Sequence, residues 1–278
     1  MGYKPHLYLK PTWPGERIPL SAAAIHHLDV VLRMVAGDRV AYTDGRGNRG
    51  SGVLADGFVV RGAERYVPRP SPALRIAVAP PRSASRQRFV VEKLSELGVD
   101  ALLWLDTGRS EGRPPRPAKA HTWAVAALQQ SRGTWLMDVS GPLALEDMLR
   151  QDMLKATSSA AAVGSTGRAC GAHSGGDLRW TWVAEPGSDA SPELSSFADC
   201  GDLITVAIGP EGGWAPGELP PGRRRFSLGP TVLRTETAAV AAAVAVLGRT
   251  RWLNPGEGSP SGTSLQAAES GLPSENSA

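Results

Sequence analysis

Leu203-Ile-Thr-Val-Ala-Ile-Gly-Pro-Glu-Gly-Gly-Trp214 is an apolar run that enters a glycine-rich loop. A second stretch of this kind, Leu228-Gly-Pro-Thr-Val-Leu-Arg-Thr-Glu-Thr-Ala238, continues into an alanine-rich segment that predicts a helix. Loops that follow parallel strands meet at one edge of a sheet, where α/β proteins bind ligands. Because glycine permits close backbone approach, the two stretches predict a ligand site built largely from backbone.

The chain upstream of these loops alternates strand and helix patterns. Leu74–Ala79 predicts a buried strand, Arg86–Leu97 a helix that ends at Gly98, and Val99–Leu105 a second buried strand. This order predicts a βαβ unit with a parallel sheet. Further elements are expected to be helices over His121–Gln130 and Leu143–Met153 and a short strand that ends at Ala184.

The first part of the chain has a different pattern. Short strands broken by Gly and Asp are expected between His6 and about Val67, with one helix over Ser21–Val35 that Ser21 caps. Proline-rich residues 68–72 form a stiff linker. We therefore expect a small β-rich domain over residues 1–70, an α/β domain over 74–253 and a disordered tail over 254–278.

Composition restricts the class of protein. The 278 residues are 41% hydrophobic with a net charge of +3, which fits a nucleic-acid partner without proving one. There is no signal-peptide pattern and no apolar run long enough to span a membrane, so we expect a cytoplasmic protein without membrane contact. The two cysteines and five histidines form no metal-ligand pattern, so no metal is expected.

The loop Gly209–Gly213 has two interpretations. Gly209 and Pro210 turn the chain out of the strand, and Gly212 and Gly213 allow a ligand to approach the backbone, while Glu211 binds the ligand or an arginine. The alternative is an ordinary tight turn with a solvated glutamate. The loop contains neither a P-loop nor a dinucleotide-binding glycine pattern, which argues against both nucleotide classes.

The second loop carries Arg234 immediately before the alanine-rich helix. Thr235 or Thr237 is expected to cap this helix, with Glu236 favoured near its N-terminus. Arg234 either forms a structural ion pair with one of the nearby glutamates or lies near a phosphate or an incoming base. The small apolar residues 238–246 predict close packing, and two identical helices that pack in this way would form a homodimer.

Together the two stretches resemble the RsmE family of ribosomal RNA uridine-N3 methyltransferases, which belong to the SPOUT superfamily. GPEGG after an apolar strand, followed by LG-x-x-x-LR-x-ETA, carries the resemblance. Upstream elements that also resemble the family are Glu92–Val99, Thr107–Ser110, Gln130–Arg132 and His27–Arg33. The resemblance covers roughly residues 6–253.

The resemblance implies a fold and a cofactor. It implies an α/β protein in which a small PUA-like β-barrel precedes a SPOUT α/β domain. The C-terminal part of the SPOUT domain would form a trefoil knot, which is a rare exception to the rule that protein chains do not thread through their own loops. Three loops, namely Ala184–Ser188, Ile208–Gly213 and Leu228–Leu233, would hold S-adenosylmethionine. The chain would act as a homodimer with its active site near the subunit interface. The implied cofactor-binding residues are Glu185, Gly187, Ile208, Gly209, Pro210, Gly212, Gly213, Leu228, Gly229, Val232 and Leu233.

The implied reaction is methylation of N3 of a specific uridine in small-subunit (16S) ribosomal RNA. Arg234 is the candidate for stabilising negative charge on the base or holding a phosphate, and Glu211 or Glu236 would orient it. Neither glutamate is assigned as a general base. The candidates for RNA contacts are Arg33, Arg39, Arg46, Arg109, Arg113 and Arg132.

Three departures from the family pattern keep other functions open. Pro80–Ser85 stands where a Lys and a Gly-Asp pair are common, Gln129 replaces an acidic residue, and residues 164–177 resemble an inserted loop. The alternatives are a non-catalytic RNA-binding or ribosome-assembly factor that retains the fold, and a knotted methyltransferase that acts on another RNA atom such as a ribose 2′-hydroxyl.

Overall fold

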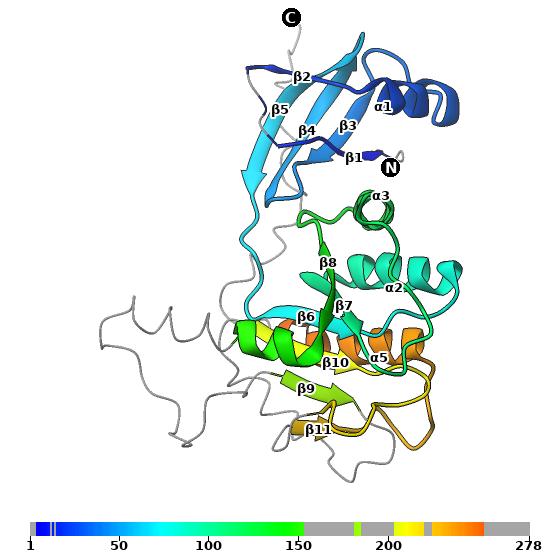
Figure 1. Cartoon of the computed structure of the whole chain (residues 1–278). Helices are drawn as coiled ribbons and strands as arrows, with labels where there is room; N and C mark the ends of the chain where they lie inside the picture. Colours follow the sequence, from blue (N-terminus) through cyan, green and yellow to red (C-terminus); the bar gives the residue numbers. More distant parts are fainter. Residues whose placement is uncertain are drawn as a thin grey trace, which may run out of the picture.

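The computed structural model describes residues 4–11, 13, 15–152, 181–184, 203–219 and 224–252. These residues form two β-sheets, one near each end of the molecule, with helices packed on the second (Figure 1). The expectations for Glu185, Gly187, the inserted loop over 164–177 and the tail over 254–278 fall outside the described residues.

The first sheet is a curled five-stranded sheet in the order β1-β3-β4-β5-β2. Only the β1–β3 pair is parallel. Its interior consists of alternate apolar residues of these strands, as a sheet with one buried face requires. The strands are β1 (His6–Tyr8), β2 (Arg17–Pro19), β3 (Arg39–Thr43), β4 (Asn48–Ala55) and β5 (Phe58–Tyr66).

The predicted helix over Ser21–Val35 is shorter than expected and changes its winding. It comprises α1 (Ala22–His26) and a π-helical turn, η1 (His27–Val31). The hydroxyl of Ser21 accepts a hydrogen bond from the backbone N–H of Ala24 at 3.2 Å, so the predicted N-cap is confirmed.

The second sheet has six parallel strands in the order β11-β9-β10-β6-β7-β8. The expected strands and the parallel sheet are therefore present. The predicted start of a helix at Leu143 is wrong, because Leu143 and Ala144 end a strand and the helix covers 145–152. The strands are β6 (Ala73–Val78), β7 (Ala101–Asp106), β8 (Asp138–Ala144), β9 (Thr181–Ala184), β10 (Leu203–Ile208) and β11 (Arg224–Phe226).

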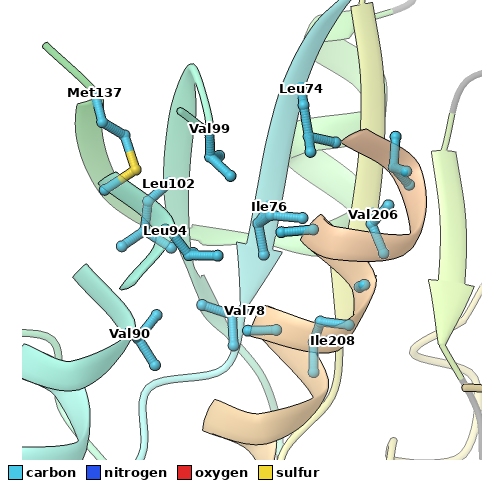
Figure 2. Packing of buried hydrophobic residues seen from close by; sticks show 14 of the residues in the cluster. Leu74, Ile76, Val78, Val90, Leu94, Val99, Leu102, Met137, Val206 and Ile208 are labelled. Atoms are coloured by element: carbon cyan, nitrogen blue, oxygen red, sulfur yellow. The ribbon is translucent and has the colours of Figure 1, made fainter. Parts of the chain in front are cut away.

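Helices cover both faces of this sheet. α2 (Ala84–Leu97), α3 (Pro117–Ser131) and α5 (Thr235–Leu247), which is followed by the π-helical turn η3 (Gly248–Trp252), contribute to one core. Figure 2 shows Val90 and Leu94 of α2 facing Ile76 and Val78 of β6 in this core. On the other face, the helix over 145–152 packs on the sheet. This two-faced burial explains why the strands are almost continuously apolar.

The two sheets are joined by a tight junction below β1, beside α3 (Figure 1). Residues 133–136 pass beneath the β3–β4 turn, where the N–H of Leu136 donates to the carbonyl of Gly45 at 2.9 Å. The indole N–H of Trp135 donates to the carbonyl of Val67 at 3.1 Å, and Arg69 pairs with Asp100 at 3.0 Å. The predicted linker is therefore anchored to the second sheet.

His6 at this junction makes stability depend on pH. Its ring is buried, and Nε2 lies 2.9 Å from the carbonyl oxygen of Gly133. Burial lowers the pKa of His6 below its ordinary value of 6.5, and the positive charges of Arg49 and Arg132 lower it further. A lowered pKa stabilises the fold above pH 6.5, and this stabilisation is lost as the pH falls below that value.

His6→Gln is therefore expected to weaken the acid-side loss of stability. The glutamine amide keeps a donor for Gly133 but does not titrate. Urea unfolding at pH values on both sides of 6.5 measures the effect. Equal pH dependence in the variant and the wild type would contradict this role of His6.

Candidate active site

The register of the parallel sheet brings four strand ends to one level. Ile208 of β10 lies opposite Val78 of β6 and Ala184 of β9, and Ala184 lies opposite Phe226 of β11. The chain leaves each of these strands at the same carboxyl edge. The loops over 209–213 and 227–234 are therefore neighbours, as the sequence predicts for a ligand site at this edge.

A pocket lies between these two loops. Nine of the expected cofactor or catalytic residues line it, namely Ile208, Gly209, Pro210, Glu211, Gly213, Leu228, Gly229, Val232 and Leu233. Ala184 and Thr231, which belong to the three loops implied to hold the cofactor, also line it. The remaining lining residues were not singled out for this pocket: Trp214, Ser227, Thr235 and Ala238. Its walls are mostly apolar side chains and glycine backbone, which suits a largely apolar ligand with a few polar groups.

Gly213 has φ +71° and lines the pocket as expected, but two other glycines of the first loop have additional or different roles. A side chain on Gly209 would lie 2.8 Å from the ring of Trp214, so this glycine makes room for Trp214. Gly212 does not line the pocket. Its carbonyl accepts a hydrogen bond from Nη1 of Arg109 at 3.0 Å, and a Cβ there would face Arg109. In the second loop, Gly229 has φ +137°, which favours glycine.

The N-terminus of α5 joins the two loops directly. The hydroxyl of Thr235 donates to the carbonyl of Gly209 at 3.3 Å. Arg234 occupies the N-cap position, and no side chain caps the helix there. The predicted cap by Thr235 or Thr237 is therefore wrong, because the Thr235 hydroxyl instead connects the helix to the first loop.

Arg86 on α2 binds both glutamates of the site. Its Nη1 lies 3.0 Å from Glu211 and its Nε lies 3.4 Å from Glu236. Glu236 is only 8% exposed, and its Oε2 has no hydrogen-bond partner among the described residues. Arg86 thus holds a buried carboxylate at the N-terminus of α5, where the helix dipole also stabilises negative charge.

Arg234 does not form the structural ion pair that the sequence left open. Arg86 occupies both glutamates instead. Arg234 is exposed, and its guanidinium has no ion pair or hydrogen bond within the part of the chain that the structure describes. A positive charge beside the pocket without a protein partner is available to a ligand.

The arginines predicted to contact RNA divide into separate groups. Arg109 and Arg113 lie on the loop after β7, and Gln87 of α2 fixes this loop by donating to the carbonyl of Arg113 at 2.8 Å. Arg33, Arg39 and Arg46 belong to the first sheet and its connections, and Arg132 ends α3. All six are exposed.

Two further classes of feature are missing from the described residues. None of their helices is long and apolar enough to cross a membrane. Across the same ranges, no group of three or more His, Cys, Asp or Glu side chains lies close enough to hold a metal ion.

Residues 68–247 match the family model described as RNA methyltransferase domain. The chain belongs to this family. A relative from Mycobacterium tuberculosis named ribosomal RNA small subunit methyltransferase E is 30% identical over 243 residues, which cover 81% of this chain and 84% of the relative. A Synechocystis protein of the same name is 25% identical over 81% of this chain and 71% of its own length.

Solved structures of similar proteins have the same fold. A probable rRNA-methyltransferase from Porphyromonas gingivalis is similar with a TM-score of 0.67 and 25% identity, over 88% of this chain and 98% of its own. The ribosomal RNA small subunit methyltransferase E of Neisseria gonorrhoeae, solved with S-adenosyl methionine bound, has a TM-score of 0.66 at 21% identity. That match covers 88% of this chain and 97% of the Neisseria chain.

Proposed function

We propose that this member of the RNA methyltransferase family transfers a methyl group from S-adenosylmethionine to N3 of a specific uridine in small-subunit (16S) ribosomal RNA in the cytoplasm. The pocket between the two loops is the observation that carries the proposal. Support comes from the relatives named ribosomal RNA small subunit methyltransferase E and from the Neisseria structure with its bound cofactor.

The pocket residues suit S-adenosylmethionine, which supplies an activated methyl group when bound. Ile208, Leu228 and Leu233 offer apolar walls, and the glycines expose backbone donors and acceptors for the polar edge of an adenine. The pocket opens at an exposed rim formed by Thr231 and Val232, along which part of the ligand would lie.

The chain's own contribution to methyl transfer is mainly positioning and charge stabilisation. N3 of uridine must lose its proton, which leaves negative charge on the base. The free guanidinium of Arg234 beside the pocket can stabilise that charge or hold the adjacent phosphate. Arg86 fixes Glu211 and Glu236 and thereby the two loops. Because N3 lies on the pairing edge of the base, the uridine must be unpaired or flipped out.

Finer details of the fold belong to the same proposal. We assign residues 1–70 to a PUA-like RNA-binding barrel, of which the curled first sheet forms the described part. Residues 74–253 form the SPOUT domain, whose C-terminal segment would be tied in a trefoil knot around the cofactor. The departures at residues 80–85 and 129 bear on RNA contacts rather than on this pocket.

We also propose a homodimer formed through α5. The helix buries one face against β6, β10 and α2, yet its other face is apolar as well. Val240, Ala241, Val244 and Ala245 lie at helical spacing on that face, and Val244 is 42% exposed. A second copy of α5 would cover these residues and bring Arg234 close to the subunit interface.

Mass spectrometry of ribosomal RNA tests the proposed reaction. A strain that lacks the gene is expected to lose one N3-methyluridine from its small-subunit RNA, and complementation is expected to restore it. Loss of a ribose 2′-O-methyl group instead would establish the other methyltransferase activity. An unchanged set of modifications would contradict the proposal and favour a non-catalytic assembly factor.

Arg86→Ala is expected to weaken binding of S-adenosylmethionine by about tenfold, which equals about 1.4 kcal/mol. The substitution leaves the buried Glu236 carboxylate without its cation and releases Glu211 from α2. Calorimetric titration measures the affinity. Arg88→Ala is the matched control, since Arg88 lies on the same helix and pairs with Glu92 at the surface. Wild-type affinity in Arg86→Ala would rule out this positioning role.

A further inference from the structure

A second cavity, which we call the junction groove, lies between the first sheet and the second. It measures about 410 Å³. Its walls include the β3–β4 turn and the start of β8 around Asp138, which is the amino edge of the parallel sheet. The cofactor pocket lies at the opposite, carboxyl edge of that sheet. The junction groove is therefore separate from the proposed methyl-transfer site.

The groove combines aromatic rings with arginines. Trp135 lines it with the guanidinium of Arg69 5.1 Å from its ring centroid. Tyr8 and His121 line it as an edge-to-face pair with centroids 6.3 Å apart. Arg46 is exposed, and its side chain has no hydrogen bond or ion pair within the described ranges. Proteins bind single-stranded nucleic acid with this combination, because bases stack on aromatic rings and phosphates pair with arginines.

Further arginines lie on β4, on β5 and at the end of α3. Arg49 of β4 lies directly opposite Arg65 of β5, and like charges in such pairs destabilise a sheet. Burial lowers the pKa of Arg49, and the charge of Arg65 lowers it further. Arg132 lies close enough to lower the pKa of His6 together with Arg49. A polyanion bound here would offset this repulsion.

The lining of the groove contains the carboxylates of Asp44 and Asp138, which have different structural roles. Asp44 is buried, and its carboxylate accepts hydrogen bonds from the N–H groups of Arg46 and Asn48 and from the Asn48 amide. Asp44 therefore serves to hold the turn that presents Arg46. Asp138 is exposed and remains the one carboxylate in the lining that lacks such a role within the described residues.

Close packing and a hydrogen bond hold the walls of the groove in place. A Cβ on Gly47 would lie 2.5 Å from the Tyr66 ring and 2.6 Å from the Trp135 ring, so the turn packs tightly on both rings. Arg69 is fixed through its Nε, which donates to Asp100 at 3.0 Å. A preformed site spends little free energy on ordering its side chains when a ligand binds.

We propose that the junction groove binds one unpaired nucleotide of the substrate RNA, with the base against Tyr8, His121 and Trp135 and the phosphate at Arg46 and Arg69. This rests on the proposed function, because that function makes RNA the ligand. The groove anchors the RNA at a point remote from the cofactor pocket and so contributes to the choice of substrate.

The double variant Arg46→Ala/His121→Ala tests the groove, since both side chains are exposed. Fluorescence anisotropy with labelled oligouridine is expected to show at least about tenfold weaker binding and a shallower salt dependence. Calorimetry is expected to show unchanged affinity for S-adenosylmethionine. Arg17→Ala is the matched control, because exposed Arg17 lies on β2 at the far edge of the first sheet.

A photocrosslink gives a second readout that does not rely on substitutions. Oligo(4-thiouridine) is expected to crosslink to peptides that contain His121 or Trp135. Wild-type RNA affinity in the double variant, or crosslinks only to other peptides, would overturn the groove proposal while methyl transfer stays intact. Failure of the wild-type protein to bind either RNA or S-adenosylmethionine would instead contradict the proposed function itself.

Discussion

Arg234→Ala is expected to lower methyl transfer to RNA by about 10²- to 10³-fold, the loss typical for removal of one charge-stabilising donor. Arg234 stands at the N-cap of α5, exposed and without an ion pair in the described structure, whereas Arg86 binds the neighbouring glutamates. Its charge is therefore free for the base or its phosphate. Because the side chain of Arg234 is exposed and has no hydrogen bond or ion pair with the described residues, the free energy of unfolding is expected to stay within about 0.5 kcal/mol of wild type.

Single-turnover methylation with saturating S-adenosylmethionine measures this effect. Arg249→Ala is the matched control, since Arg249 is also exposed but follows the C-terminal end of the same helix. Its turnover is expected to be near that of the wild type. Near-normal turnover in Arg234→Ala would remove Arg234 from the reaction and leave the charge on the base to another group.

Asp100→Ala is expected to destabilise the fold by about 3–5 kcal/mol, because it leaves the largely buried guanidinium of Arg251, which is 10% exposed, without its acidic partner. Asp100 is 6% exposed and immediately precedes β7. Its Oδ1 accepts from Arg69 of the linker at 3.0 Å. Its Oδ2 accepts from the N–H of Leu74 at 2.8 Å and from Arg251 after α5 at 2.5 Å. One carboxylate thus ties together the linker, the first strand of the parallel sheet and the C-terminal turn.

Urea unfolding measures this loss of stability. Asp106→Ala is the control, because Asp106 ends the same strand and is exposed. It is expected to change the free energy of unfolding by less than about 0.5 kcal/mol. A similarly small change in Asp100→Ala would show that Arg69, Leu74 and Arg251 find other partners or solvent without cost.

Strand and helix patterns predicted much of the second sheet because its strands are buried on both faces. Leu74–Ala79, Val99–Leu105 and Leu203–Ile208 all lie in or overlap strands at the expected places. β8 was missed because it contains Gly141 and Pro142, which normally interrupt a strand. β8 lies at the edge of the sheet, where proline is tolerated because one side of the strand needs no hydrogen bonds.

The sequence predicted only those parts of the site that are formed by residues close together in the chain. The glycine motifs predicted the position of the pocket. They did not predict that the ring of Trp214 fills the space beside Gly209. Arg86 contacts Glu211 across 125 residues of sequence, so only the fold brings them together. The junction groove likewise draws on both sheets, and periodicity within one segment carries no signal for it.

Binding of S-adenosylmethionine to the pocket tests the central claim most directly. Calorimetry on the wild-type chain is expected to show one bound cofactor per chain. Val232→Trp places an indole at the pocket rim, where Val232 is 80% exposed and its replacement does not disturb the core. We expect this variant to bind at least about tenfold more weakly. The control Val35→Trp, at a 67% exposed position of the first domain, is expected to bind normally. No heat of binding in the wild type, or equal affinity in all three proteins, would contradict the account.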